Sequence, residues 1–185
     1  HAVAAAALEA GLRADPAAPD ALRVALALHL VAAGEIERAD AALAACADQH
    51  GAVRTARACA ILSGDDFRAG LPAAEAAVAD EPRSAANQNN LGIALLYAGR
   101  ADEARTAFAR AHDLDPDLPG ALYNLAIVES FYFYDRAAGR EWFRRYREVA
   151  GGAAADPDDL AGRLDVAGEP GGAQASLTTG AGGTP

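Results

Sequence analysis

The stretch 90–111, NLGIALLYAGRADEARTAFARA, decides the fold. In each half, apolar and small residues recur at steps of three and four, as on one face of an amphipathic helix. These residues are Leu91, Leu95, Ala104, Phe108 and Ala111. Gly99 separates the two halves and Pro116 follows the second, and both residue types interrupt helices. The stretch therefore predicts two helices joined by a tight turn, which is a helical hairpin.

The pattern of this hairpin returns at a fixed distance along the chain. Matching residues lie 34 positions apart in the pairs Pro82 and Pro116, Asn90 and Asn124, Leu91 and Leu125, and Phe108 and Trp142. A period of this length is typical of helical repeat proteins. The next unit is expected over 119–150, with Ala138, Trp142 and Arg145 as the buried positions of its second helix. Its turn at 131–135 lacks glycine, which leaves open a shift of that helix by one residue.

Earlier parts of the chain follow the same spacing. Residues 20–50 match well, and 51–84 match less well, with Pro72 expected in the opening turn of the second helix. Residues 1–16 match only the second half of a unit. The chain is therefore expected to start inside a repeat. The apolar stripe along 4–12 would then be covered by protein that precedes His1 or by another subunit.

The hairpin at 85–118 resembles the tetratricopeptide repeat (TPR). The resemblance rests on the pair Leu91-Gly92, the turn at Gly99, the small and aromatic residues of the second helix, and the closing Pro116. It implies an all-α, right-handed superhelical solenoid of antiparallel hairpins, with about four repeats plus a half-repeat. Members of this family commonly hold other proteins, so the resemblance also implies a binding scaffold rather than an enzyme.

The pattern stops after about residue 150. Asp156-Pro157-Asp158-Asp159 has the composition of a helix start, and we expect one short capping helix within 151–165 that reaches Leu164. From 166 to 185 the chain consists mostly of Gly, Ala, Thr and Pro, which is typical of a flexible tail.

Composition excludes several classes of partner. The formal net charge is −10 and the pI is about 4.7, which argues against nucleic acid and anionic lipid as main partners. No apolar run is long enough for a membrane span, so direct insertion by this segment is not expected. All 16 basic residues are arginine, and we interpret this bias as the signature of a high-GC bacterial genome. The compartment stays open between cytoplasm and periplasm, because a segment upstream of His1 could carry an export signal or anchor.

The resemblance also points to a binding surface. In TPR proteins the position of Asn90 and Asn124 lines an inner groove, where amides hold the backbone of an extended peptide. Helical spacing adds further residues to this stripe: Asn89, Ile93, Tyr97, Tyr123, Ile127 and Phe131. The asparagines fit equally well as caps, as bridges between helices or as solvated surface. Tyr97 and Phe131 fit packing between repeats as well as they fit ligand contact.

Two further features are candidates for partner contact. Phe131, Tyr132, Phe133 and Tyr134 are consecutive, so at least one ring is expected to be exposed or covered by a partner. Packing of this cluster against the capping helix explains it equally well. A basic stripe at helical spacing is formed by Arg136, Arg140, Arg144 and Arg147. It would suit an acidic partner segment, although a solvated face paired with Glu141 and Glu148 is the favoured interpretation.

Catalysis finds no support in the sequence. The chain has no phosphate-binding glycine loop, HExxH motif or serine elbow, and its histidines lack metal-ligand spacing. Cys46 and Cys59 are too far apart for a zinc or redox pair, and are interpreted as buried thiols. No catalytic residue, metal site or cofactor is predicted. The leading function is a scaffold for a peptide or partner protein. The alternatives are an accessory subunit of a larger complex, or the substrate-holding arm of an enzyme with its catalytic part elsewhere.

Overall fold

The structure is a computed structural model that describes residues 1–64, 67–151, 156 and 159–164. The predicted tail at 166–185 and part of the predicted capping segment lie outside these residues. Over the described ranges the secondary structure is helical and contains no β-strand. The all-α prediction is therefore confirmed.

The helices follow one another with short connections. Their bounds are α1 (Ala2–Ala14), α2 (Asp20–Val31), α3 (Ile36–Ala44), α4 (Ala52–Ser63), α5 (Phe67–Asp80), α6 (Ala85–Tyr97), α7 (Ala101–Leu114), α8 (Pro119–Phe131), α9 (Arg136–Ala150) and α10 (Leu160–Arg163). None of these helices is long and apolar enough to cross a membrane.

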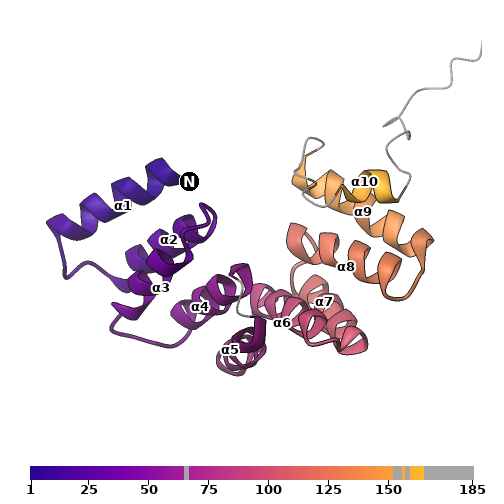
Figure 1. The fold of residues 1–185 in the computed structure, drawn as a ribbon, viewed down its shortest axis with the longest axis horizontal. Coiled ribbons are helices and arrows are strands. Elements are labelled where there is room, and N and C mark those ends of the chain that lie inside the picture. Colours follow the sequence, from indigo (N-terminus) through magenta and orange to yellow (C-terminus); the bar gives the residue numbers. More distant parts are fainter. Residues whose placement is uncertain (65–66, 152–155, 157–158, 165–185) are drawn as a thin grey trace, which may run out of the picture.

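The helices form a curved array of hairpins (Figure 1). After α1, successive helices pack in pairs: α2 with α3, α4 with α5, α6 with α7 and α8 with α9. The first helices of the pairs also contact one another, because α2 packs on α4, α4 on α6 and α6 on α8. They form a shared row, which we call the inner row. The second helices α3, α5 and α7 each pack on the first helix of the following pair. The exact limits of the repeat units remain our proposal.

The hairpin of α6 and α7 depends on a close approach of the two helices. A Cβ atom added at Gly92 would lie 2.4 Å from Cε1 of Phe108, whose side chain is fully buried. The turn passes through Gly99 in the left-handed region (φ +73°), which glycine adopts without steric cost. The amide of Arg100 then donates to the carbonyl of Leu95 at 2.9 Å and closes the turn.

The hairpin of α2 and α3 repeats this arrangement. Its residues at the matching positions are all buried: Leu26, Ala27, Leu30, Ala39, Leu43 and Cys46. The amide of Glu35 donates to the carbonyl of Leu30 at 2.9 Å and closes the equivalent turn. However, α3 already ends at Ala44, and an irregular linker at 45–51 follows. Gln49 caps the early end of α3, because its amide nitrogen donates to the carbonyl of Leu43 at 3.3 Å, and it also donates to the carbonyl of Cys46 at 2.7 Å.

The hairpin of α8 and α9 corrects one prediction. The expected core positions Ala138, Trp142 and Arg145 are only partly buried, and the buried residues are Gly139, Phe143 and Tyr146. The second helix is therefore displaced by one residue, the shift that the glycine-free turn had left open. The closing bond shows the cause, because the amide of Asp135 donates to the carbonyl of Glu129, six residues back, at 2.8 Å. The same bond spans five residues in the α2–α3 and α6–α7 turns.

The hairpin of α4 and α5 corrects the predicted position of Pro72. Pro72 was expected in the opening turn of its helix, but α5 begins at Phe67 and Pro72 lies inside it as the sixth residue. It lacks the amide hydrogen that would bond the carbonyl of residue 68. Two alanines of the same helix, Ala74 and Ala77, are fully buried and maintain the packing of the hairpin.

The two ends of the array differ. At the first end α1 packs on α2, with Ala5 buried and Leu8 and Leu12 half-buried against the core, while Val3 is exposed. At the other end α10 is short, and its Leu160 is buried, as is the following Leu164. Both leucines join the core formed by α8 and α9.

Candidate functional site

The inner row has little charge in its second half. Helix α6 contains no charged residue, and α8 contains only Glu129, which is buried. In α4, Arg54 and Arg57 each form an ion pair, with Asp80 and Asp40 respectively. A chain with a net charge of −10 thus carries an electrically neutral surface along α6 and α8.

Asn89 and Asn124 connect α6 and α8. The side-chain nitrogen of Asn124 donates to the side-chain oxygen of Asn89 at 3.0 Å. Asn89 also lies against Gly120, where an added Cβ would be 3.5 Å from its amide nitrogen. The sequence had paired Asn124 with Asn90 as equivalent positions, but the hydrogen bond runs to the neighbouring asparagine.

Asn90 is the predicted ligand contact with the most available amide. Its side chain is half-buried and makes no hydrogen bond to any other residue in the described part of the chain. Two other predicted contacts on α6 differ in exposure. Ile93 is partly buried and packs with the core residues of α6 and α7, whereas Tyr97 at the end of α6 is 55% exposed.

Three of the predicted ligand contacts on α8 pack against the C-terminal end of the chain. Tyr123, Ile127 and Phe131 are partly buried in the cluster that contains Leu160 and Leu164. The hydroxyl of Tyr123 donates to Asp156 at 2.9 Å, and its ring contacts Tyr146 edge-on at 5.0 Å. The guanidinium of Arg163 lies 4.0 Å from the centre of the Phe131 ring. Helix α10 thus removes part of this surface from contact with a ligand.

The aromatic turn divides into covered and exposed rings. Phe131 faces α10 as described, and Phe133 lies under the guanidinium of Arg105 at 4.7 Å. Tyr132 is 45% exposed and Tyr134 is 83% exposed. Among the described residues, Phe131 and Phe133 therefore pack against the array, and Tyr132 and Tyr134 remain exposed.

The basic stripe of α9 is neutralised at its centre. Arg144 forms ion pairs with both Glu141 and Glu148. The hydrogen bond with Arg144 lowers the pKa of Glu141, and these contacts raise the pKa of Arg144. Arg136 and Arg140 are exposed and have no acidic partner among the described residues.

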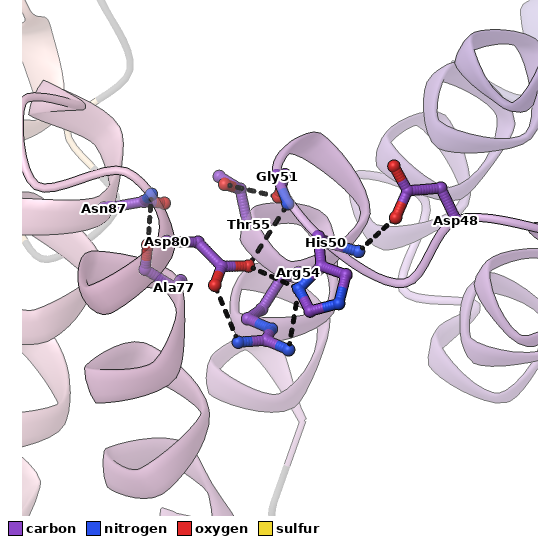
Figure 2. A network of polar contacts seen from close by, with 8 residues as sticks. All are labelled: Asp48, His50, Gly51, Arg54, Thr55, Ala77, Asp80 and Asn87. Carbon is purple, nitrogen blue, oxygen red and sulfur yellow. Dashed lines mark hydrogen bonds and ion pairs between the residues drawn. The ribbon is translucent and has the colours of Figure 1, made fainter.

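A polar cluster that the sequence did not predict joins the linker to two helices (Figure 2). The carboxylate of Asp80 accepts from Arg54 Nη1 at 2.9 Å and from the amide of Gly51 at 3.3 Å. The ring of His50 lies 3.3 Å from the same carboxylate. His50 and Asp80 are 30 positions apart and belong to no motif, so no sequence signal connects them. The cluster fixes the start of α4 to the end of α5, and its arginine and carboxylate are paired.

Metal and thiol chemistry receive no support from the geometry. Over the described ranges there is no group of three or more His, Cys, Asp or Glu side chains arranged to hold a metal ion. Cys46 and Cys59 are free thiols, and burial raises the pKa of both. A raised thiol pKa lowers the thiolate fraction, so neither has the environment of a reactive cysteine.

Comparison with solved structures identifies the fold. TTC0263, a thermophilic TPR protein from Thermus thermophilus, superposes with a TM-score of 0.68 at 17% identity, covering 88% of this chain and 87% of that one. YrrB, described as a TPR protein with an unusual peptide-binding site, has a TM-score of 0.57 at 19% identity, covering 88% and 81%. MamA from Desulfovibrio magneticus has a TM-score of 0.58 at 21% identity, covering 80% and 84%.

At these identities the likeness establishes the fold. The chain is a helical repeat solenoid with the architecture of TPR proteins, as the resemblance of residues 85–118 implied. No protein-family profile and no curated protein sequence matches the chain.

Proposed function

We propose that this protein is an interaction scaffold that holds an extended, uncharged peptide segment of a partner along α6 and α8. Support for a scaffold comes from the TPR fold and from its likeness to YrrB, a TPR protein with a peptide-binding site. The chemistry of the inner row supports the position of the site and the kind of ligand.

The observation that carries the proposal is the combination of free amides with a neutral surface. An extended peptide presents alternating N–H and C=O groups, and an asparagine side chain can satisfy either. The hydrogen bond between Asn124 and Asn89 holds both side chains in place and leaves the nitrogen of Asn89 and the oxygen of Asn124 free of other bonds in the described structure. Together with Asn90 they provide donors and acceptors for a peptide backbone.

Apolar residues beside these amides supply the remaining contact. Tyr97 is exposed at one end of α6, and Ile93 is partly exposed one turn away from Asn89 and Asn90. Aromatic residues contribute strongly to protein interfaces because they bury a large area with few rotatable bonds. Tyr123, Ile127 and Phe131 are given a smaller part in the site, because α10 covers part of each.

The experiment compares inner-row variants of the full chain for binding to a peptide selected from a display library. We expect Asn90→Ala combined with Asn124→Ala to weaken binding about tenfold or more, because each lost hydrogen bond costs roughly 0.5–1.5 kcal/mol. Gln88→Ala is the matched control, since Gln88 is an amide on the same helix that donates to Pro82 outside the proposed site. Circular dichroism should show that all variants stay folded. Equal affinity for the double variant and the wild-type chain would remove the inner row as the binding site.

A further inference from the structure

The turn between α8 and α9 differs from the equivalent turns in a way that packing does not explain. It contains one additional residue, as the bond from Asp135 to Glu129 shows. The equivalent turns pass through Gly34 and Gly99 at φ +78° and +73°, whereas this turn passes through Tyr134 at φ +59°. A side chain in the left-handed region is strained, and such strain persists where the surroundings or a function require it.

The ring of Tyr134 is not packed into the part of the array that the structure describes. It is 83% exposed and makes no hydrogen bond or ring contact with the residues that the structure describes. Tyr132, two positions earlier, is 45% exposed and also lacks such contacts in the described part of the chain. A glycine at position 134 would form the same turn without strain, so the exposed tyrosine calls for an explanation outside the fold.

Charge is concentrated next to these rings. Helix α9 contains five arginines and two glutamates, which gives it a net charge of +3 in a chain whose net charge is −10. Its central Arg144 is already paired with two glutamates. Arg136 and Arg140 lie one helical turn apart at the start of α9 and have no carboxylate partner in the described ranges. Asp135, between Tyr134 and Arg136, caps the helix by accepting from the amide of Ala138. With two arginines and one aspartate, the segment 134–140 has a net charge of +1 beside the exposed rings.

We propose that Tyr132, Tyr134, Arg136 and Arg140 form a second docking surface, the elbow patch, which binds an acidic segment of a partner protein. Guanidinium groups bind carboxylates through paired hydrogen bonds, and tyrosine and arginine are among the residues most enriched at the energetic centres of interfaces. Apolar side chains between the acidic residues would pack on the two rings. The overall negative charge opposes nucleic acid, which carries a dense and extended line of phosphates.

The elbow patch is separate from the inner row. It lies on the α8–α9 turn and the second helix of the last hairpin, whereas the proposed peptide site lies on α6 and α8 (Figure 1). Loss of one site should leave the other intact. The failure of either proposal can therefore be distinguished from failure of the other.

The test uses the full chain and a synthetic peptide in which aspartate and glutamate alternate with leucine. Nuclear magnetic resonance on the isotope-labelled chain should show amide shifts confined to 132–140. Arg136→Ser combined with Arg140→Ser should weaken binding by at least about tenfold, because guanidinium–carboxylate pairs are strong charge-assisted contacts. The control is Arg83→Ser combined with Arg110→Ser, which removes two other exposed arginines that have no acidic partner within the described structure.

Tyr134→Gly separates binding from folding. It should keep or raise the melting temperature, because glycine relieves the strain at φ +59°, and yet weaken peptide binding. The proposal is wrong if the control pair of arginines matters equally, or if a peptide with glutamine and asparagine in place of the acids binds as well. It is also wrong if the shifts map to α6, or if a single-stranded oligonucleotide binds the patch more tightly than the acidic peptide.

Discussion

Glycine residues at two positions set the distance between the helices of a hairpin. At Gly92 an added methyl group would collide with the buried ring of Phe108, and at Gly139 it would lie 1.8 Å from the hydroxyl oxygen of Ser130. The contact with Phe108 explains why a glycine follows Leu91 in the repeat pattern. Close packing of this kind has no free volume to absorb even one carbon atom.

Gly92→Ala should therefore destabilise the protein by about 1–3 kcal/mol, the usual cost of overpacking a core. Gly11→Ala is the matched control on α1, because nothing lies within 4 Å of the added carbon and the backbone is helical. That control should be stabilising by roughly 0.5–1 kcal/mol, since alanine is the better helix former. Urea unfolding measures both changes, and a neutral Gly92→Ala would show that Phe108 can move aside.

Glu129 is a second residue whose position matters. It occupies the place of Leu30 and Leu95 in the other hairpins, yet it is buried with one carboxylate oxygen paired to Arg105 at 2.7 Å. Its other oxygen is buried and has no hydrogen-bond partner in the described structure. Arg105 is half-exposed, so solvent weakens its attraction to Glu129. The ion pair therefore offsets little of the free energy lost when the carboxylate is buried.

We expect Glu129→Leu to stabilise the protein by about 1 kcal/mol, because it removes an unsatisfied buried oxygen and keeps the volume filled. Glu129→Ala should instead destabilise it by roughly 1–3 kcal/mol through the cavity it leaves. The two variants can be compared by urea unfolding followed through the fluorescence of Trp142. If both variants lose stability to the same extent, the ion pair between Glu129 and Arg105 contributes more to the free energy of unfolding than the exposure of Arg105 indicates.

At the scale of elements, the sequence predicts the helix pairs better than it predicts the register of α9 or the packing of α10 on α8. Spacing identified the two helices of the 85–118 hairpin and the glycine turn between them, because these depend only on residues within one unit. The contact of Gly92 with Phe108 was found only in the structure. The fixed 34-residue period failed at α9, because one inserted residue before Arg136 moves every later position of that helix. Packing of Phe131 against the capping helix was one of two explanations that the sequence left open, and the structure has it. The cover of Tyr123 by α10 was not predicted, since α10 belongs to no repeat.

Helix α10 is held by a carboxylate, which makes its docking sensitive to acid. Burial raises the pKa of Asp156, but hydrogen bonds from the amides of Ala161 and Leu160 and from the Tyr123 hydroxyl outweigh it. The pKa of Asp156 in the folded protein therefore lies below its ordinary value. A lowered pKa stabilises the docked helix above the unfolded value of about 3.9, and this contribution is lost as pH falls through the folded pKa.

Amide exchange at Leu160 and Leu164 should accordingly be slow near neutral pH, and the protection should be lost as the pH falls below about 4. Asp156→Asn should weaken the docking at neutral pH and remove this dependence on pH. Asp113→Asn, on the exposed side of α7, serves as the control. Exchange that stays slow for Asp156→Asn at neutral pH would show that the two leucines alone hold α10.

At the scale of the molecule, stability is expected to be distributed along the array. Among the described residues, each hairpin packs mainly on its neighbours, so distant hairpins support each other weakly. The only tryptophan, Trp142, belongs to α9 in the last hairpin. Its ring contacts the ring of His112 edge-on, with 5.1 Å between the ring centres. Its fluorescence therefore reports one end of the array, while circular dichroism reports the whole.

Leu43→Ala in α3 should cost about 2–5 kcal/mol locally, as for other buried leucines. It should lower the midpoint of unfolding measured by circular dichroism more than the midpoint measured by Trp142 fluorescence. Phe143→Ala in α9 should have the opposite effect. Identical shifts of both probes for both variants would mean that the array unfolds as a single cooperative unit.

The inner row has a mechanical consequence. The first helices touch one another along one side, and α3, α5 and α7 each pack on the first helix of the next pair as well as on that of their own. We expect an array built in this way to bend more easily than it stretches. Under tension it should first straighten at little cost and then lose hairpins one at a time. A unit of 34 residues, such as 85–118, would release roughly 115 Å of extended chain, a step that force spectroscopy resolves. If it acts as the proposed scaffold, such an array would hold its partner and give way gradually when the two are pulled apart.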